Sequence, residues 1–324
     1  MILKDLYNKE EESFLGYLKP EITSDGTKTL YNDYYNECLH CKKGARKESY
    51  EKYIYPVNFN NFSRKRIKVL DVCMGMGYNS SSIIEHVNGQ DVSLDLHCLE
   101  IDKRPLEYSL NDCDIQRFWS NDVKEVLNNM LYKGSNESKF CKSKVYWGDA
   151  RQRIIDLPVN YTYDLIMLDP FSPSKCPELW TEEFLNSVIS KLALTGVLLT
   201  YSSSAAVRST MLNKGIKIFS LSTKGKSARE WSNGTVGINR VVDESKALNK
   251  KYSRSLSRME KEHLGTKASI PYRDPTNEMN SKSILEKRKC EQYRSSLEST
   301  SVWRDRWYKQ NLPKDSRFPR EERI

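Results

Sequence analysis

Acidic side chains and glycines follow several short apolar runs in this 324-residue sequence, and these residues have the types and spacing that chemistry requires. The first run leads to Asp71, and Gly75, Gly77 and Asn79 come after it. Glycine has no Cβ, so a loop of this composition lets the backbone pass close beside a ligand. The helix expected next would point its N-terminus at that ligand. The loop therefore predicts a ligand site, although several kinds of nucleotide-binding fold use one and a tight structural turn is the alternative.

The spacing inside the loop departs from the dinucleotide fingerprint and excludes a P-loop. A dinucleotide fingerprint has a third glycine, whereas Asn79 and Ser80 stand in that region here. The loop also lacks the Gly-Lys-Ser/Thr sequence of a P-loop. The glycine loop alone therefore leaves the nature of the ligand open, and the residues at the ends of the next apolar runs indicate it.

Acids also end the second and third apolar runs. The second run leads to Glu100, Asp102 and Lys103, and the third leads to Asp149 and Ala150. Glu100 or Asp102 can accept hydrogen bonds from both hydroxyls of a ribose. Asp149 can accept one from the exocyclic amine of a base. Together with the glycine loop, these residues predict a binding site for S-adenosylmethionine.

The fourth run ends in Asp169-Pro170-Phe171, and Pro173 and Pro177 stiffen the segment that follows. Methyl transfer to an amine needs a neutral amine whose lone pair points at the methyl carbon, so positioning contributes most of the catalysis. A carboxylate can orient an N–H group and later take its proton. We therefore predict that Asp169 and Phe171 are catalytic, with Phe171 stacking on a base and Asp169 also close to the cofactor. A helix cap is the alternative for Asp169, but an acid directly after a buried run suits that role poorly.

These residues require a scaffold that brings the ends of the runs together. Short apolar runs alternate with helical patterns, which predicts an α/β domain with a mostly parallel sheet. Ligands bind beyond the carboxyl ends of the strands in such sheets. The predicted strands are residues 67–73, 94–99, 144–147, 164–169, 196–201 and 216–221, and the main predicted helices are residues 78–87, 122–131, 181–192, 204–214 and 283–293.

Composition divides the chain into a polar, tyrosine-rich entry segment at residues 1–62, a methyltransferase domain at 63–239 and a basic extension at 240–324. The extension holds 21 Lys+Arg against 13 Asp+Glu, and the rest of the chain holds 31 against 30. A concentrated positive charge favours a polyanion such as nucleic acid. Trp303, Trp307 and Tyr308 would add stacking on bases. A solvated tail is the alternative.

Other features limit the location and the metal content. The eight cysteines are scattered, and the close pair Cys38 and Cys41 has no second pair of ligands at the spacing of a zinc site. We expect no metal.

No apolar run reaches the roughly 18 residues of a membrane span, and residues 1–12 lack the features of a secretory signal. We therefore expect a cytoplasmic protein.

Residues 29–218 resemble the methyltransferase domain of MnmC, which completes the methylaminomethyl group on the wobble uridine of certain tRNAs. The most specific segment is residues 168–181, LDPFSPSKCPELWT, because the family pattern is Leu-Asp-Gly-Phe-x-Pro-x-Lys-x-Pro-x-x-Trp-Thr. Other similar segments are residues 29–32 with His40, 44–45, 48–49, 71–79, 102–106, 200–203 and 207–208.

This resemblance implies a class I, Rossmann-like methyltransferase fold with a seven-stranded sheet, S-adenosylmethionine as methyl donor and an aminomethyluridine in tRNA as acceptor. It places Asp169 at the transfer site, although Pro170 replaces the family's glycine. Residues 240–324 contain no second glycine fingerprint. We therefore expect a stand-alone form without the flavin-dependent oxidoreductase domain, so that another enzyme supplies the amine.

Two alternatives come from other classes. Spermidine-synthase-like aminopropyltransferases and small-molecule methyltransferases share acidic strand ends. The spermidine synthase loop is usually Gly-Gly-Gly-x-Gly, however, and a cationic polyamine gives no reason for a basic extension. The other alternative is an RNA-binding protein that has lost catalysis, and the intact Asp169-Pro170-Phe171 segment argues against it.

Overall fold

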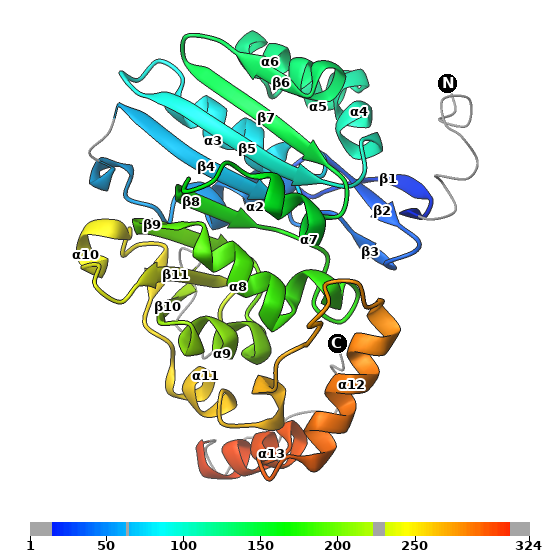
Figure 1. The fold of residues 1–324 in the computed structure, drawn as a ribbon, viewed down its shortest axis with the longest axis vertical. Helices are drawn as coiled ribbons and strands as arrows, with labels where there is room; N and C mark the ends of the chain where they lie inside the picture. The colour runs from blue at the N-terminus through cyan, green and yellow to red at the C-terminus, as the bar shows by residue number, and fades with distance from the viewer. Residues whose placement is uncertain (1–14, 63–64, 223–230, 312–324) are drawn as a thin grey trace.

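A nine-stranded sheet with helices on both faces forms the centre of the computed structural model, which describes residues 15–62, 65–222 and 231–311 (Figure 1). Its strand order is β12-β10-β11-β9-β8-β4-β5-β7-β6. The strands are β4 (Arg66–Val72), β5 (Ser93–Glu100), β6 (Ser135–Glu137), β7 (Cys141–Trp147), β8 (Tyr163–Leu168), β9 (Leu192–Thr200), β10 (Ile216–Leu221), β11 (Thr235–Asn239) and β12 (Ser253–Arg254).

The five strands at the centre of this sheet are parallel. β4 pairs with β5 and β8, β5 also pairs with β7, and β8 also pairs with β9. The chain moves outward from β4 to β7 and then returns to β8 on the other side of β4, so the strand order reverses there. Such a reversal opens a crevice at the carboxyl ends of the strands. The predicted mostly parallel α/β sheet is confirmed, and the short strands β6 and β12 extend it at its two edges.

Consecutive residues of the central strands face opposite sides of the sheet, so each strand contributes to two cores. Val69 packs on one side of the sheet with residues of α3, α4 and α6. Leu70 packs on the other side with residues of the 3₁₀ turn η4 and of α8 and α9. Both side chains are fully buried, which explains why the strands read as continuous apolar runs. The helices are α3 (Tyr78–Val87), α4 (Arg104–Asn111), α5 (Cys113–Gln116), α6 (Asn121–Lys133), α7 (Ala150–Arg153) with the 3₁₀ turn η4 (Ile154–Asp156), α8 (Glu182–Ser190) and α9 (Ala205–Asn213).

The N-terminal segment forms its own small sheet beside the carboxyl ends of the central strands (Figure 1). The segment has three antiparallel strands followed by short helical turns. Leu30 and Tyr53 of this segment are fully buried in the same core as Val69. The elements are β1 (Leu18–Ile22), β2 (Lys28–Asn32), β3 (Glu37–Cys38), α2 (Ala45–Ser49), the π-helical turn η2 (Tyr50–Ile54) and η3 (Phe59–Asn61).

The basic extension is largely helical and packs against the sheet domain. Glu260 is buried and forms an ion pair of 3.2 Å with Arg208 of α9. The predicted helix at 283–293 is confirmed as α12. The elements are α10 (Glu244–Ala247), α11 (Arg258–His263), η6 (Lys267–Ser269), α12 (Ser281–Arg294) and α13 (Thr300–Asn311).

The structure corrects the role predicted for two aromatic residues of the extension. Trp303 and Trp307 are only 1% and 4% exposed, because they pack with Met259 of α11. Their rings are therefore part of a small core, and the prediction that they stack on RNA is wrong. Tyr308, the third residue of that set, is 44% exposed.

Neither a membrane span nor a metal cluster is found in the described ranges. No helix there is long and apolar enough to cross a membrane. The same residues contain no group of three or more His, Cys, Asp or Glu side chains placed to hold a metal ion.

Candidate active site

A cavity of about 410 Å³ lies at the carboxyl ends of β4, β5 and β8, where the N-terminal segment meets the sheet. This volume is within the usual range for small-molecule sites. The predicted site residues that line it are Gly75, Glu100, Asp102, Asp169 and Phe171. The structure thus brings together residues from three separate strand ends.

The glycine loop has the backbone shape expected of a close ligand contact. Gly75 and Gly77 have φ angles of +54° and +82°, which disfavour any other residue. A Cβ on Gly77 would also lie 3.0 Å from Leu106. Asp71 lies beneath this loop rather than in the cavity wall, and its carboxylate accepts a 2.7 Å hydrogen bond from Ser80. Burial raises the pKa of Asp71 to about 7.

Glu100 connects the end of β5 to the glycine loop. Its carboxylate accepts hydrogen bonds from the backbone N–H groups of Gly75 at 2.7 Å, Ile101 and Asp102. Burial nevertheless raises the pKa of Glu100 to about 7. Asp102 also lines the cavity, but both of its oxygens accept hydrogen bonds from the Arg104 guanidinium.

Asp169 is held from two sides. The Tyr53 hydroxyl donates to one carboxylate oxygen at 2.6 Å, and the Asn79 amide donates to the other at 2.7 Å. Burial, followed by the nearby Glu48 carboxylate, raises the pKa of Asp169 to about 8. The amide oxygen of Asn79 is buried and has no hydrogen-bond partner within the described part of the chain. Asp169 therefore holds its proton near neutral pH, and the amide oxygen of Asn79 beside it can accept a further hydrogen bond.

Phe171 forms part of an aromatic wall of the cavity. Its ring stacks on Tyr35 of the N-terminal segment, with ring centroids 4.2 Å apart and planes 20° apart. The backbone on either side is fixed, since Trp180 donates to the Phe171 carbonyl and the Tyr201 hydroxyl donates to the Pro170 carbonyl. Trp180 belongs to the 3₁₀ turn η5 (Pro177–Trp180).

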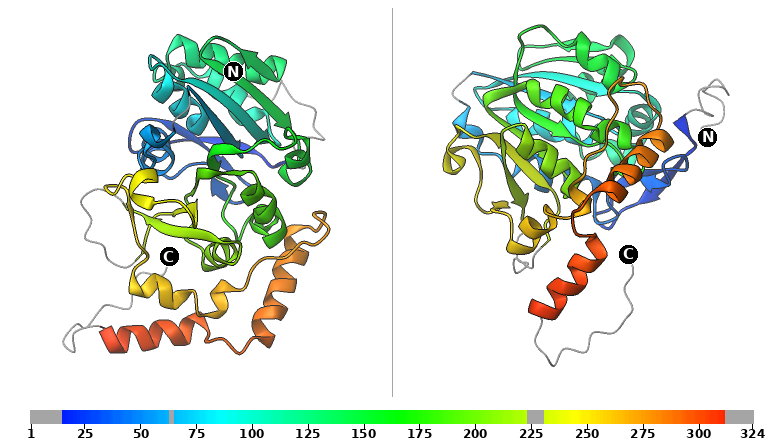
Figure 2. Two further views of the ribbon diagram at one scale, coloured as in Figure 1. Left: turned by 60° about the vertical axis from the view of Figure 1, so that its left-hand side comes forward. Right: turned by 60° about the horizontal axis from the view of Figure 1, so that its bottom comes forward.

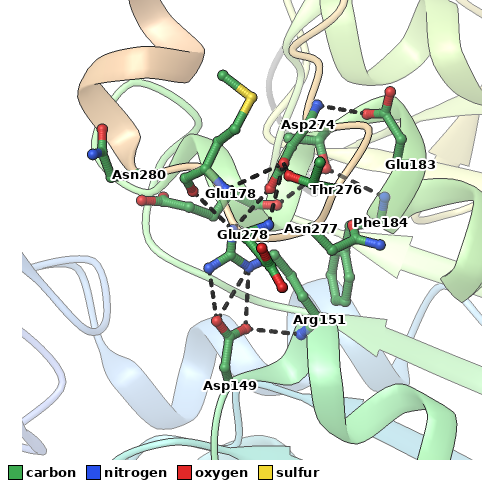
Figure 3. A network of polar contacts seen from close by, with 12 residues as sticks. Asp149, Arg151, Glu178, Glu183, Phe184, Asp274, Thr276, Asn277, Glu278 and Asn280 are labelled. Carbon is green, nitrogen blue, oxygen red and sulfur yellow. Dashed lines mark hydrogen bonds and ion pairs between the residues drawn. The ribbon is translucent and has the colours of Figure 1, made fainter.

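The remaining predicted residues lie outside the cavity wall. Lys103 places its ammonium 5.3 Å from the centre of the Trp147 ring, and Ala150 is the buried first residue of α7. Asp149 caps α7 and is bound by the Arg151 guanidinium, with a closest contact of 2.7 Å. Arg151 also forms a 2.8 Å ion pair with Asp274, a fully buried residue of the extension (Figure 3).

Several wall residues were not assigned roles from the sequence, and neither was Tyr53, which is bonded to Asp169 but does not itself line the cavity. Glu48 and Lys52 form an ion pair one helical turn apart, and Lys52 lies 5.2 Å from the centre of the Tyr201 ring. Residues 1–62 have no clean periodicity, so only the family resemblance marked Glu48. These missed residues are Tyr35, Glu48, Lys52, Tyr53 and Tyr201.

The charges of the wall fit the proposed cofactor. S-adenosylmethionine carries a positive sulfonium and a positive amino group, and an amine acceptor is also cationic in water. Carboxyl groups outnumber ammonium groups around the cavity, and a bound cation would favour the ionised forms of Glu100 and Asp169, whose pKa values burial raises. The acids are Glu37, Glu48, Glu100, Asp102 and Asp169, and the bases are Lys42 and Lys52.

The fold and this site define an S-adenosylmethionine-dependent methyltransferase. Residues 113–235 match a family model described as an S-adenosyl-L-methionine-dependent methyltransferase. The crystal structure of MNMC2 from Aquifex aeolicus superposes with a TM-score of 0.73 and 25% identity, over 90% of this chain and 94% of that one. The chain thus resembles MnmC-type proteins, and the predicted fold, enzyme class and cofactor are confirmed.

Two curated relatives extend this comparison. An uncharacterized protein of Methanocaldococcus jannaschii, MJ0670, is 27% identical over 311 residues, which cover 92% of this chain and 79% of that protein. The bifunctional MnmC protein of Campylobacter hominis, named for tRNA 5-methylaminomethyl-2-thiouridine biosynthesis, is 26% identical over 183 residues. That match covers 54% of this chain but 27% of the bifunctional protein.

Proposed function

We propose that this methyltransferase acts on the aminomethyl group of a modified wobble uridine in tRNA. The observation that carries the proposal is Asp169, held in the cavity wall by Tyr53 and Asn79 with its pKa raised to about 8. The likeness to MNMC2 and to the bifunctional MnmC protein supports a tRNA amine as the acceptor. Because the matching family model is described as a methyltransferase, methyl transfer is favoured over aminopropyl transfer.

The cofactor would lie between the glycine loop and the end of β5. Gly75 leaves room for it, while Asp71, Gly77 and Asn79 fix the shape of the loop beneath and beside it. Glu100 or Asp102 would accept hydrogen bonds from the ribose hydroxyls, since Glu100 is held by backbone N–H groups and Asp102 by the Arg104 guanidinium at the rim of the cavity. Asp149 and Ala150 would border the adenine, and Lys103 the ribose side. S-adenosylmethionine supplies a methyl group made electrophilic by its sulfonium.

Asp169 is the residue that would take a proton from the acceptor amine. An aminomethyl group is protonated in water, and its nitrogen can form a bond to carbon only after a proton has left. Asp169 can accept that N–H and take the proton, since a base works best when its pKa lies near the working pH. Tyr53 and Asn79 keep the two carboxylate oxygens in place, which preserves the geometry that the transfer requires. Phe171, supported by Tyr35, offers a surface on which the uracil ring can stack.

The test is methylation by the full chain with methyl-labelled S-adenosylmethionine. The substrate is tRNA from a strain that installs the aminomethyl group but cannot methylate it. Mass spectrometry of the digested nucleosides should show the label on the aminomethyluridine, and tRNA without the aminomethyl group should remain unlabelled. The substrate assignment fails if the protein binds the cofactor and leaves this nucleoside unmethylated. Nucleosides from a strain lacking this gene should show the unmethylated amine.

A further inference from the structure

Helix α12 of the extension starts at the rim of the catalytic cavity. The hydroxyl of Ser281, its first residue, donates to the Glu178 carboxylate of η5. The same turn contributes Leu179 to the cavity wall, next to Cys176. From this anchor the helix runs away from the sheet, on the side where β1, β2 and β3 close the cavity (Figures 1 and 2). One end of α12 is therefore fixed close to the catalytic residues.

The inner face of α12 holds the helix to the extension. Ile284 is fully buried, and the Arg288 guanidinium donates to the carbonyl groups of Ala268 and Ile270. Gln292 donates to the carbonyl of Lys267. These contacts fix which side of the helix faces outward.

The outer face combines cations with an aromatic ring. Lys282, Lys289 and Tyr293 are spaced by seven and four residues, so they lie on one side of the helix, and Arg294 is next to them. All four are exposed, and Tyr293 is 88% exposed. Glu286 is also exposed on this face. The folded protein makes no use of the ring of Tyr293 as a packing surface.

The cations of this face are unpaired within the described ranges. The structure gives no ion pair or side-chain hydrogen bond for Lys282, Lys289 or Arg294 there. The same holds for Lys175, which is exposed in the segment between Asp169 and η5. Because Lys175 precedes Cys176 of the cavity wall, it extends the line of positive charge from α12 to the cavity.

We propose that Lys175 and the outer face of α12 bind the RNA strand on either side of the base that enters the cavity. Lysine and arginine neutralise phosphates, and an exposed tyrosine stacks on an unpaired base. Fourteen residues of helix span about 21 Å, which is long enough for several nucleotides. The outer face has no large aliphatic side chain, which suits a nucleic acid better than a lipid surface. This inference rests on the proposed function, because it places an RNA base in the cavity.

The test compares two full-length variants with matched changes. One carries Lys282→Glu, Lys289→Glu and Tyr293→Ala on α12. The control carries Lys133→Glu, Lys139→Glu and Tyr132→Ala, all exposed residues around α6, which lies at the opposite end of the molecule (Figure 1). Calorimetry should give both variants the wild-type affinity for S-adenosylmethionine, which shows that the fold and cavity are intact.

Fluorescence anisotropy with labelled tRNA then measures the surface directly. We expect the α12 variant to bind tRNA at least about tenfold more weakly, with a slope of log Kd against log salt smaller by about two, because two phosphate contacts are lost. The control variant should bind like the wild type. Equal tRNA affinity in the α12 variant and the wild type overturns the inference. The inference is also overturned if the protein binds no tRNA but binds anionic vesicles, and the α12 variant loses that vesicle binding.

This readout separates the inference from the proposed function. RNA binding that depends on α12, in a protein that leaves the aminomethyluridine unmethylated, supports the RNA surface and refutes the substrate. Methylation with unchanged kinetics in the α12 variant refutes the surface and supports the substrate.

Discussion

The hydroxyl of Tyr53 lies 2.6 Å from the Asp169 carboxylate although 116 residues separate the two in the sequence. Tyr53 is fully buried in the N-terminal segment, and Asp169 directly follows the central strand β8. The N-terminal segment therefore supplies a hydrogen-bond donor to Asp169 as well as one wall of the cavity. Four predictions test this arrangement and the two connections between the extension and the sheet domain.

Replacing Tyr53 by Phe should reduce kcat about tenfold and leave cofactor affinity unchanged. The ring remains, but Asp169 loses a hydrogen bond of the kind that contributes about 1.5–3 kcal/mol when one partner is charged. That hydrogen bond lowers the pKa of Asp169, so its loss should move the pH–rate profile to higher pH. Steady-state kinetics from pH 6 to 10 would measure both effects. Tyr55→Phe, at an exposed tyrosine nearby, is the control, and an unshifted profile for Tyr53→Phe would contradict the prediction.

Asp169→Ala should preserve cofactor binding and lower transfer by about 10² to 10⁴, the usual contribution of a general base. In the wild type, the carboxyl is protonated below its pKa of about 8 and cannot take a proton, so activity should rise with pH and level off above that value. Asp169→Asn should remove this part of the profile and leave only the ionisation of the amine. Unchanged transfer in either variant would remove Asp169 from the mechanism.

Asp274→Asn should weaken binding of S-adenosylmethionine several-fold with little change in kcat. Asp274 holds Arg151, and Arg151 holds Asp149, which we propose borders the adenine. Calorimetry on Asp274→Asn, Asp149→Asn and the double variant would show whether the two changes are less than additive, as expected for residues in one network. Asp305→Asn, at an exposed acid of α13, is the control. If Asp149→Asn weakens binding and Asp274→Asn does not, the extension has no part in the cofactor site.

Glu260→Gln should lower the free energy of unfolding by about 3–5 kcal/mol, because it leaves the buried guanidinium of Arg208 without its counter-charge. Burial raises the pKa of Glu260, but hydrogen bonds from Ser257 and Arg254 and the charge of Arg208 hold it at about 2. The carboxylate therefore stabilises the fold above its unfolded pKa near 4.5, and this contribution is lost as the pH falls toward 2. Urea unfolding at pH 7 and pH 3 should show a smaller difference between variant and wild type at pH 3.

The exposed pair of Lys217 and Glu244 provides the control for this measurement. Glu244→Gln should leave the free energy of unfolding close to the wild-type value, as is usual for surface ion pairs. A Glu260→Gln variant with the same urea midpoint as the wild type at pH 7 would show that the extension is not held by this ion pair.

The sequence alone was sufficient to locate the central strands and the residues at their ends. Gly75, Glu100 and Asp169 were predicted because the apolar run before each one, and the glycines of the loop, are local signals. A parallel sheet then brings such strand ends to one edge whatever the surrounding segments do. The helices predicted at residues 181–192 and 283–293, which are α8 and α12, depended on equally local patterns.

Only the tertiary structure decided which distant side chains complete the site. Tyr53 reaches Asp169, Tyr35 reaches Phe171 and Asp274 reaches Arg151 through packing between segments that have no shared sequence pattern. The same packing buries Trp303 in a core, although its sequence context matched an exposed stacking residue. The reason is that a local pattern reports whether a residue suits a helix or a strand, whereas its contacts depend on free energy gained across the whole fold.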